Sequence, residues 1–260
     1  MDLGLKGKSA IVTGASRGIG HSIAAALAGE GVSVLLVARD EERLKKNVDT
    51  IRSDGGTAEY VAIDLRSPNS SELCVAEAIR AFGHLDVVVN NAGDTKRGNF
   101  FELSDVDWAN GFSLKFYSYM KMARTAWPHL RARQGSIVNI IGSNANAGHA
   151  IFTIGGAVNS ALVSLTKSLA DIGVVEGVRV NAINPGSILS DRLISRIGFE
   201  ATTRNLTQDA AAQKILDDYR ISRFGRPEEI ADMVLFLASG RAGYVQGAIV
   251  DVDGGLNRAI

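Results

Sequence analysis

The chain has very few of the residues that build metal centres and covalent cross-links. Cys74 is the only cysteine among 260 residues, which excludes an internal disulfide and a metal site built on cysteine. Its four histidines are scattered and form no HxxxH pair, so the sequence predicts no bound metal ion. Nothing in the composition indicates a protein held together by disulfides or metals.

The chain also has no excess of charge. Its 28 basic and 28 acidic side chains give a formal net charge of zero, and no long run of Lys and Arg forms a basic patch. A balanced charge gives no general attraction to nucleic acid or to an anionic membrane surface. We therefore expect a small-molecule substrate and no nucleic-acid partner.

Long apolar segments are missing as well. No uninterrupted apolar run reaches the roughly 20 residues that a membrane-spanning helix needs. The sequence enters a predicted strand within its first ten residues, which leaves no room for a signal peptide. We expect a cytoplasmic protein that does not contact a membrane.

What the sequence does contain is a regular alternation of short apolar runs with longer amphipathic stretches. This alternation predicts βαβ units and one domain spanning residues 1–260. Residues 187–219 are polar and irregular, and we expect them to cover a substrate pocket that is lined in part by Leu193, Ile194 and Phe199. The predicted strands are 9–13, 32–38, 58–63, 87–90, 136–141, 178–184 and 248–252. The predicted helices are 18–30, 41–53, 71–82, 105–130 (stopped or bent near Pro128), 156–174 and 227–238.

A glycine-rich segment, TGASRGIG at residues 13–20, lies between the first predicted strand and the first helix. Gly14 permits a tight turn, and Gly18 lets the backbone approach a pyrophosphate at the positive end of the helix. Gly20 allows that helix to pack closely on the sheet. The segment predicts a dinucleotide site, because it stands in the strand–turn–helix context that such a site requires.

Together with NNAG at 90–93 and NPG at 184–186, this segment resembles the short-chain dehydrogenase/reductase family. The resemblance implies a Rossmann-like α/β fold, a doubly wound parallel sheet of about seven strands with helices on both faces. It places the 64–65 segment at the adenine, the 91–93 loop beneath the adenine ribose and the 185–188 segment at the nicotinamide carboxamide. Turn and capping roles are the alternatives at these positions. The implied cofactor-binding residues are Gly14, Ser16, Arg17, Gly18, Ile19, Gly20, Arg39, Asp64, Leu65, Asn91, Ala92, Gly93, Pro185, Gly186 and Ile188.

The end of the second predicted strand indicates which nucleotide is bound. NAD-dependent enzymes of this type place an acid there to hold the ribose 2′-hydroxyl. This chain has Ala38 followed by Arg39, with Arg17 nearby, and two guanidiniums suit a 2′-phosphate. We therefore predict NADP(H), with Asp40 weakening the preference. The alternative is that Arg39 is a solvated loop residue.

The catalytic positions that the resemblance implies are changed. The family's Tyr-x-x-x-Lys motif falls on Gly155 and Asn159, and its serine falls on Gly142, beside Ser143. The family's asparagine in the long helix falls on Lys115. Lys and Asn have thus exchanged places, which suggests that the positive charge has been moved.

Several side chains are candidates for the missing chemistry. A Lys115 ammonium would bind the nicotinamide ribose or polarise a substrate oxygen, unless it lies on the helix surface. Ser143 and Asn159 are further candidates. His149, which has a suitable pKa, is a candidate donor or else a solvated or capping residue. Tyr119, four residues after Lys115, is either a relocated acid or a packed tyrosine. Gly155 and Gly156 disfavour a helix, so we expect that helix to begin near Ala157.

Two functions fit these observations. The first is an NADP(H)-dependent oxidoreductase that acts on a carbonyl or alcohol of unknown identity through an atypical proton relay. The second is a catalytically inactive nucleotide-binding protein, a sensor or a partner subunit. The family resemblance and the small residues along the 156–174 helix also imply a homodimer or homotetramer.

Overall fold

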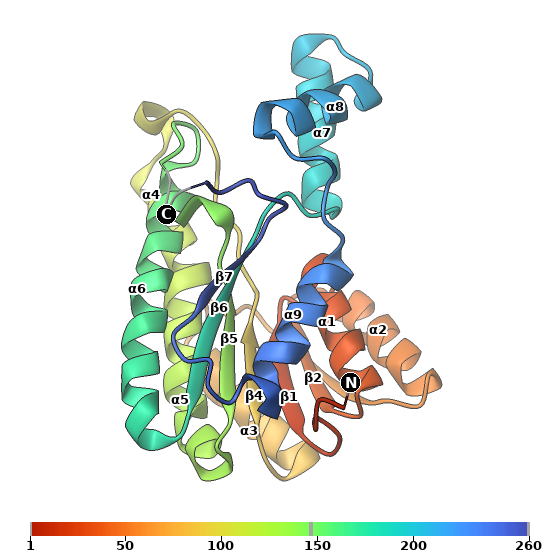
Figure 1. Ribbon diagram of the computed structural model, residues 1–260, viewed down its shortest axis with the longest axis vertical. Helices are drawn as coiled ribbons and strands as arrows, with labels where there is room; N and C mark the ends of the chain where they lie inside the picture. The colour runs from red at the N-terminus through yellow and green to blue at the C-terminus, as the bar shows by residue number, and fades with distance from the viewer. Residues whose placement is uncertain (1, 146–147, 259–260) are drawn as a thin grey trace.

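Seven parallel strands form one sheet in the order β3-β2-β1-β4-β5-β6-β7 (Figure 1). The structure is a computed structural model that describes residues 2–145 and 148–258. The sheet confirms the predicted fold class, and each predicted strand lies within about two residues of its observed bounds. The strands are β1 Ser9–Thr13, β2 Ser33–Ala38, β3 Thr57–Ala62, β4 Val87–Asn90, β5 Ser136–Ile140, β6 Arg179–Pro185 and β7 Ile249–Val252.

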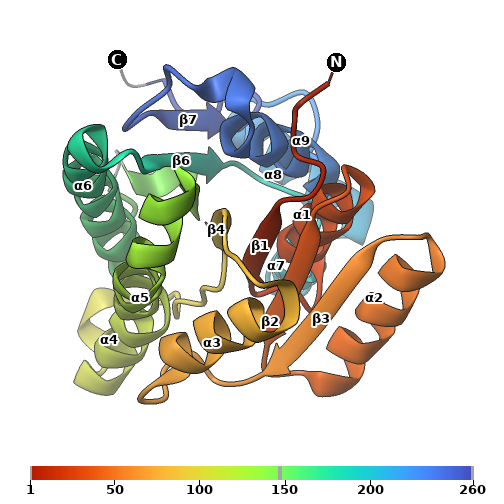
Figure 2. The ribbon, with the colours of Figure 1, turned by 90° about the horizontal axis from the view of Figure 1, so that it is seen from below.

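Helices cover both faces of the sheet (Figure 2). On one face α1 (Gly18–Gly29) packs against α9 (Pro227–Ala238), with α2 (Glu41–Ser53) beside β2 and β3. The other face carries α3 (Ser70–Phe82), α5 (Ser118–Arg133) and α6 (Thr153–Glu176). The inner strands are apolar along their length because both faces are covered: Ile11 packs into one helix layer and Val12 into the other, and both are fully buried.

The long helix predicted over 105–130 is interrupted by a wider turn. It consists of α4 (Asp105–Gly111), a π-helical segment at Phe112–Tyr117, and α5. A π-helical segment of this kind often marks a functional site, and this one carries Lys115. The sequence predicts that the helix ends at Leu130 and stops or bends near Pro128; it does not stop there, since α5 continues through Pro128 to Arg133. The buried stripe of Met122, Ala126 and Leu130 holds it on the sheet past the proline.

Residues 187–219 are not irregular. They form α7 (Asp191–Arg204) and α8 (Gln208–Tyr219), which project from the end of the molecule where the strands finish (Figure 1). Only Leu193 and Ala201 of α7 are buried. The apolar residues of α7 follow a helical period as clearly as those of α2, so this signal was present in the sequence and was missed. Ile194 and Phe199, expected in a pocket lining, are largely exposed.

The helix predicted from residue 156 begins three residues earlier, at Thr153. Both glycines therefore lie in its first turn, and the expected start near Ala157 is wrong. By length and composition α6 is the one described helix that could cross a membrane. In this structure it packs along β6, with 33% of its apolar window buried inside the protein.

Candidate functional site

The carboxyl ends of β1 and β4 lie side by side at the point where the strand order reverses. From β1 the chain proceeds to β2 and β3 on one side, and from β4 to β5 and β6 on the other. In an open parallel sheet, ligands bind in front of such a reversal, because the loops that follow the two strands diverge there. The glycine-rich loop follows β1, and the 91–99 loop follows β4.

The glycines of the 13–20 loop leave space that neighbouring backbone and side-chain atoms occupy. Gly14 has a φ of +68°, and a Cβ there would lie 2.8 Å from the Asn91 amide nitrogen. A Cβ on Gly20 would lie 2.3 Å from the Gly14 carbonyl oxygen. Gly18 also has a positive φ, of +55°. The loop can close this tightly only with glycine at these positions.

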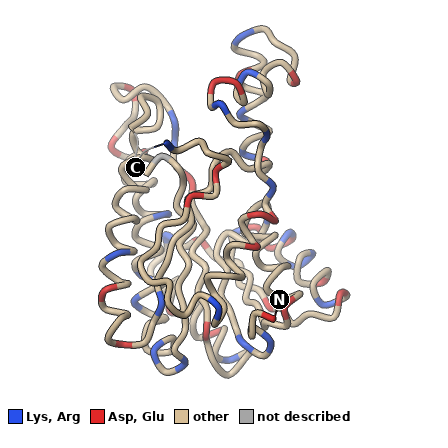
Figure 3. Tube along the Cα trace, in the orientation of Figure 1, with Lys and Arg blue, Asp and Glu red and all other residues tan. Residues whose placement is uncertain are grey.

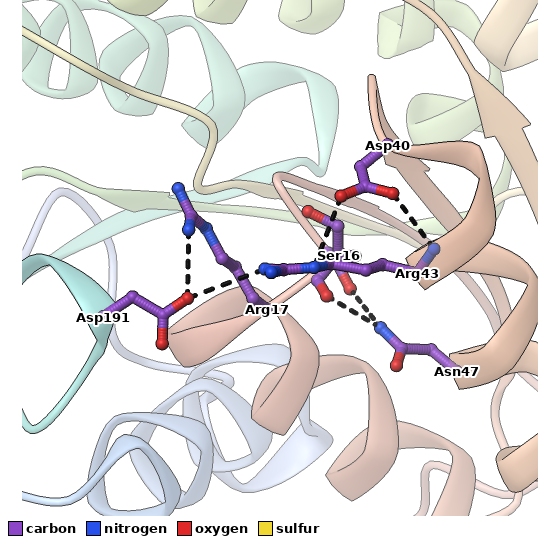
Figure 4. Close-up of polar contacts among 7 residues, drawn as sticks. Ser16, Arg17, Asp40, Arg43, Asn47 and Asp191 are labelled. Carbon is purple, nitrogen blue, oxygen red and sulfur yellow. Dashed lines mark hydrogen bonds and ion pairs between the residues drawn. The ribbon is translucent and has the colours of Figure 1, made fainter.

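Side chains from two directions fix this loop. The Asn91 amide donates to the Thr13 carbonyl at 3.0 Å, and its backbone N–H donates to the Thr13 hydroxyl at 2.9 Å. From α2, the Asn47 amide donates to the carbonyls of Ala15 and Ser16, both at 3.1 Å (Figure 4). The N-terminus of α1 has no side-chain cap among the described residues. Its first N–H groups are therefore open to an anion, which fits the pyrophosphate of a dinucleotide.

An arginine pair stands beside this loop (Figure 4). Arg17 contacts Asp191 at 2.9 Å, and Arg43 lies 3.6 Å from the same carboxylate oxygen. Arg43 also pairs with Asp40, which caps α2. Sequence reasoning named Arg17 and Arg39 and missed Arg43, although its place three residues after the Asp40 cap was a usable signal. Exposed Arg39 takes part in no ion pair within the described ranges.

The proposed adenine end has a carboxylate in place. Asp64 follows β3 and accepts three side-chain hydrogen bonds from Arg66, at 3.0, 3.1 and 2.6 Å. The bonds from Arg66 hold the pKa of the Asp64 carboxyl below its usual value. Leu65 beside it is buried and packs in the core under α3.

The segment after β6 is held tightly. Pro185 ends the strand, and a Cβ on Gly186 would lie 2.7 Å from the Asp253 Cα. Ile188 is buried and pairs as an isolated bridge with Gly225. This backbone is therefore fixed next to the ends of β5 and β6. Ile19 and Ala92, both half-buried, complete the predicted cofactor-binding set.

Lys115 lies inside the site and not on the helix surface. Its ammonium donates to the Asn159 amide oxygen at 2.8 Å and to the Ile141 carbonyl at the end of β5. The two positions that the resemblance exchanges are thus in direct contact. Burial, and then the positive charge of Arg192, lower the pKa of Lys115 to about 7.

Two glycines make room for this pair. A Cβ on Gly93 would lie 2.9 Å from the Lys115 Cδ, and a Cβ on Gly142 would lie 3.0 Å from the Asn159 amide nitrogen. Gly142 also has a φ of +144°, which disfavours any other residue. The side chains of Lys115 and Asn159 therefore fill space that a larger residue in either loop would need.

The space beside Gly155 is also filled by a neighbouring side chain. The ring of Phe152 occupies the space where its side chain would be, since a Cβ would lie 2.0 Å from the Phe152 Cζ. The guanidinium of Arg97, from the loop after β4, lies 4.0 Å from the centre of that ring. Sequence reasoning gave no role to Phe152 or Arg97, because nothing local connects them.

The remaining candidates lie around this group. Tyr119 is fully buried and its hydroxyl donates to the Ile140 carbonyl at 3.0 Å, so it is packed as the alternative interpretation had it. Burial raises its pKa. Exposed His149 stands before α6, with its pKa lowered by burial and by Arg97 and Arg196. Ser143 begins a short 3-10 turn after β5. Within residues 2–145 and 148–258, no three His, Cys, Asp or Glu side chains form a metal-binding group.

Known proteins resemble this chain over nearly its whole length. The family model described as enoyl-(acyl carrier protein) reductase matches residues 14–257. The 3-oxoacyl-(acyl-carrier-protein) reductase FabG of Staphylococcus aureus is 33% identical over 254 residues, covering 96% of this chain and 98% of that protein. The short-chain reductase protein NovJ of Streptomyces niveus is 32% identical over 252 residues, covering 95% and 92%.

Solved structures agree with these relatives. L-Sorbose reductase from Gluconobacter frateurii, complexed with NADPH and L-sorbose, superposes with a TM-score of 0.96 at 33% identity, covering 100% of both chains. A variant of actinorhodin polyketide ketoreductase with NADPH gives 0.92 at 30% identity, covering 97% of this chain and 98% of that one. The fold, the fixed loops at the strand ends and these matches lead to one conclusion: the chain belongs to the short-chain dehydrogenase/reductase family of oxidoreductases.

Proposed function

We propose that this protein is an NADP(H)-dependent oxidoreductase that acts on a small carbonyl or alcohol and uses Lys115 as its proton donor and acceptor. The observation that carries the proposal is the bond between Lys115 and Asn159, at 2.8 Å, beside the ends of β4 and β5. The resemblance implies that Tyr and Lys of the usual motif are replaced here by Gly155 and Asn159. The relay is then reassigned to the half-buried ammonium of Lys115.

Preference for NADP(H) is supported by the arginines around the ribose end. Arg17 and Arg43 converge on one carboxylate oxygen of Asp191, which shows that an anion is accommodated between them. A 2′-phosphate is an anion of the same kind, with more oxygens to accept charge-assisted bonds. The L-sorbose reductase and the actinorhodin ketoreductase were both solved with NADPH.

The chemistry can be followed through the chain's own atoms. With reduced nicotinamide bound as the hydride source, the substrate carbonyl oxygen would become negative and would need a proton from the protein. Lys115 carries three N–H donors, of which two bond to the Asn159 amide oxygen and the Ile141 carbonyl. One proton remains for the substrate oxygen.

The two hydrogen bonds also suit the state after proton transfer. A neutral amine keeps two N–H groups, and both stay bonded to Asn159 and Ile141. Burial penalises the charged form, so the pKa of Lys115 lies at about 7 and the proton is released readily near neutral pH. In the oxidative direction the neutral amine accepts the alcohol proton by the same route.

The alternative is a nucleotide-binding protein without turnover, a sensor or partner subunit. The absence of a tyrosine at 155 favours it, since a lysine has to replace the usual donor. The fixed 185–188 segment, implied to meet the nicotinamide, argues for the oxidoreductase. A homodimer or homotetramer also belongs to this proposal, supported by the exposed apolar side chains of Ile172, Val174 and Val175 on α6.

Substitution of Lys115 tests the proposal. Lys115→Met keeps the length of the stem and removes the proton, so turnover should fall by about 100- to 10,000-fold, the usual contribution of a positioned acid or base. NADPH fluorescence should show that the cofactor still binds. Turnover is followed at the nicotinamide absorbance with a panel of carbonyls and alcohols.

Lys121→Met is the matched control, because it makes the same change in the helix that follows Lys115 without touching the site, and it should leave turnover unchanged. Unchanged turnover and cofactor affinity in Lys115→Met would remove Lys115 from the mechanism. No turnover in the unmodified protein, together with micromolar NADPH binding, would establish the nucleotide-binding alternative.

A further inference from the structure

The substrate side of the site carries positive groups without acidic partners. Arg97 stands in the loop after β4, and Arg192 and Arg196 lie four residues apart on α7. The charges of Arg196 and Arg192 act on Arg97, and that of Arg192 also acts on Lys115. Those of Arg97 and Arg196 act on His149. The loop after β4, α7 and the proposed proton donor are therefore close enough for their charges to interact.

Arg97 is held in place by an aromatic ring. Its guanidinium lies 4.0 Å from the centre of the Phe152 ring, which itself fills the space above Gly155. Stacking on a ring face fixes the plane of a guanidinium and leaves its N–H edge for a ligand. Part of the Arg97 side chain is exposed to solvent. Burial of the rest, and then the charges of Arg196 and Arg192, lower the pKa of Arg97 to about 10.

The two arginines of α7 add to the same charge. Residues four apart lie on one helix face, and like charges at that spacing destabilise a helix. The Arg196 guanidinium lies 4.9 Å from the centre of the Tyr219 ring of α8, so it too is supported by an aromatic ring. No carboxylate forms an ion pair with Arg97, Arg192 or Arg196 within the described ranges.

Several other arginines of the molecule are paired with acids. Arg66 bonds to Asp64, Arg223 to Glu229, and Arg204, at the far end of α7, to Glu200. Acidic and basic residues are interspersed along most of the chain (Figure 3). Arg97, Arg192 and Arg196 differ from these in forming no ion pair among the described residues, and the charge of Arg192 reaches the proposed proton donor.

From this grouping we infer that Arg97, Arg192 and Arg196 bind an anionic group, a carboxylate or a phosphate, on the substrate whose carbonyl oxygen meets Lys115. Planar guanidiniums recognise both anions through paired, charge-assisted hydrogen bonds. That the bound anion belongs to a substrate rests on the proposed function. The anion site itself can be tested by binding without turnover.

The test measures the affinity of four small ketones by isothermal titration calorimetry, with saturating NADP⁺ present so that the nucleotide site is occupied. Levulinate and neutral levulinamide form the carboxylate pair. Dihydroxyacetone phosphate and neutral dihydroxyacetone form the phosphate pair. One or both anions should bind at least about tenfold more tightly than the neutral partner, the effect of one charge-assisted bond. The pair with the larger ratio identifies the anion.

Substitutions assign the effect to the arginines. Arg97→Met and Arg196→Met should each lower the affinity for the preferred anion about tenfold and leave the neutral ketone unchanged. Arg204→Met is the matched control on α7, where the guanidinium pairs with Glu200, and it should change neither affinity. Circular dichroism checks that every variant is folded.

Three results would overturn the inference. Equal affinity for anionic and neutral probes, or no binding of any probe at about 50 mM, would show that the site does not hold an anion. An equal loss of both affinities in Arg97→Met would show a packing role. A loss of NADP⁺ affinity without a change in probe affinity would assign these arginines to the cofactor. Detectable binding without turnover in any assay would reject the proposed oxidoreductase and keep the anion site.

Discussion

The loop after β1 and the side chains around Lys115 both need glycine, for different reasons. In the loop, Gly14 and Gly20 leave space for the Asn91 side chain and for the loop's own backbone, with a Cβ at Gly20 only 2.3 Å from a carbonyl oxygen. Around Lys115, Gly93 and Gly155 leave space that neighbouring side chains fill. The first arrangement fits the proposed dinucleotide site. The second fits the proposal that Lys115 supplies the proton.

The comparison shows how one half of a site can change while the other is kept. A dinucleotide is held largely by backbone N–H groups and a helix end, so few side-chain choices satisfy that loop. A proton donor is a single side chain, and another helix can supply it if the space is adjusted. The contacts of these positions fit the proposed rearrangement: Gly142 faces Asn159, Gly155 faces Phe152, and Asn159 accepts from Lys115.

The largest effect on binding is expected from filling the nucleotide loop. Gly20→Ala places a Cβ against the Gly14 carbonyl and forces the loop to move. NADPH affinity, measured by fluorescence, should fall by about a hundredfold, at the upper end of the cost of overpacking. Gly29→Ala makes the same change at the other end of α1, where a Cβ would meet nothing within 4 Å. If both variants bound NADPH equally well, the loop would not be the cofactor site.

The pH dependence of turnover tests Lys115 as the proton donor and acceptor. Because the pKa of Lys115 lies at about 7, carbonyl reduction needs the ammonium and should fall about tenfold per pH unit above pH 7. Alcohol oxidation needs the neutral amine and should rise up to that pH and then level off. Steady-state rates in both directions between pH 5 and pH 9 give the two profiles. Profiles that do not bend near neutral pH would exclude Lys115.

The lowered pKa of Lys115 also makes the free energy of unfolding depend on pH. The folded pKa of Lys115 lies below its unfolded value, so the unfolded chain binds more protons between about pH 7 and pH 10.5. The free energy of unfolding of the unmodified protein, relative to Lys115→Met, should therefore rise with pH across that window by up to about 1.4 kcal/mol per unit. Urea titrations at several pH values measure it. A flat difference would mean that the ammonium is not penalised by burial.

Restoring a tyrosine should not restore the usual site. Gly155→Tyr places its Cβ in the Phe152 ring, and we expect a loss of about 1–3 kcal/mol in the free energy of unfolding without a gain in turnover. Ala157→Tyr, at an exposed position in the same turn, should cost less. Adding Phe152→Ala to Gly155→Tyr should recover part of the loss. A Gly155→Tyr variant as stable as the unmodified protein would contradict the explanation that Phe152 fills this space.

The sequence predicted the sheet and the glycine loop because each depends on local pattern or on motif spacing, and it left Lys115 open between the site and the helix surface. It did not predict α7 and α8, where only a few positions are buried. Phe152 above Gly155, Arg43 beside Arg17, and Arg97 near α7 were also missed. Each of these contacts joins segments that the sequence separates or gives no reason to pair.

The smallest effect should come from the ion pair between α7 and the nucleotide loop. Asp191 contacts Arg17 and Arg43 from the first turn of α7, in a largely exposed position (Figure 4). If a 2′-phosphate takes the place of this carboxylate, Asp191→Asn should raise NADPH affinity a few-fold and leave NADH affinity unchanged, since exposed pairs are weak and screened by salt. Arg43→Met should lower NADPH affinity alone. Fluorescence titrations with both nucleotides at low and high salt measure the difference. An equal change for NADPH and NADH would place the arginine pair outside the 2′ position, and the contrast between a kept nucleotide half and a rebuilt proton-transfer half would then lose its evidence for NADP(H).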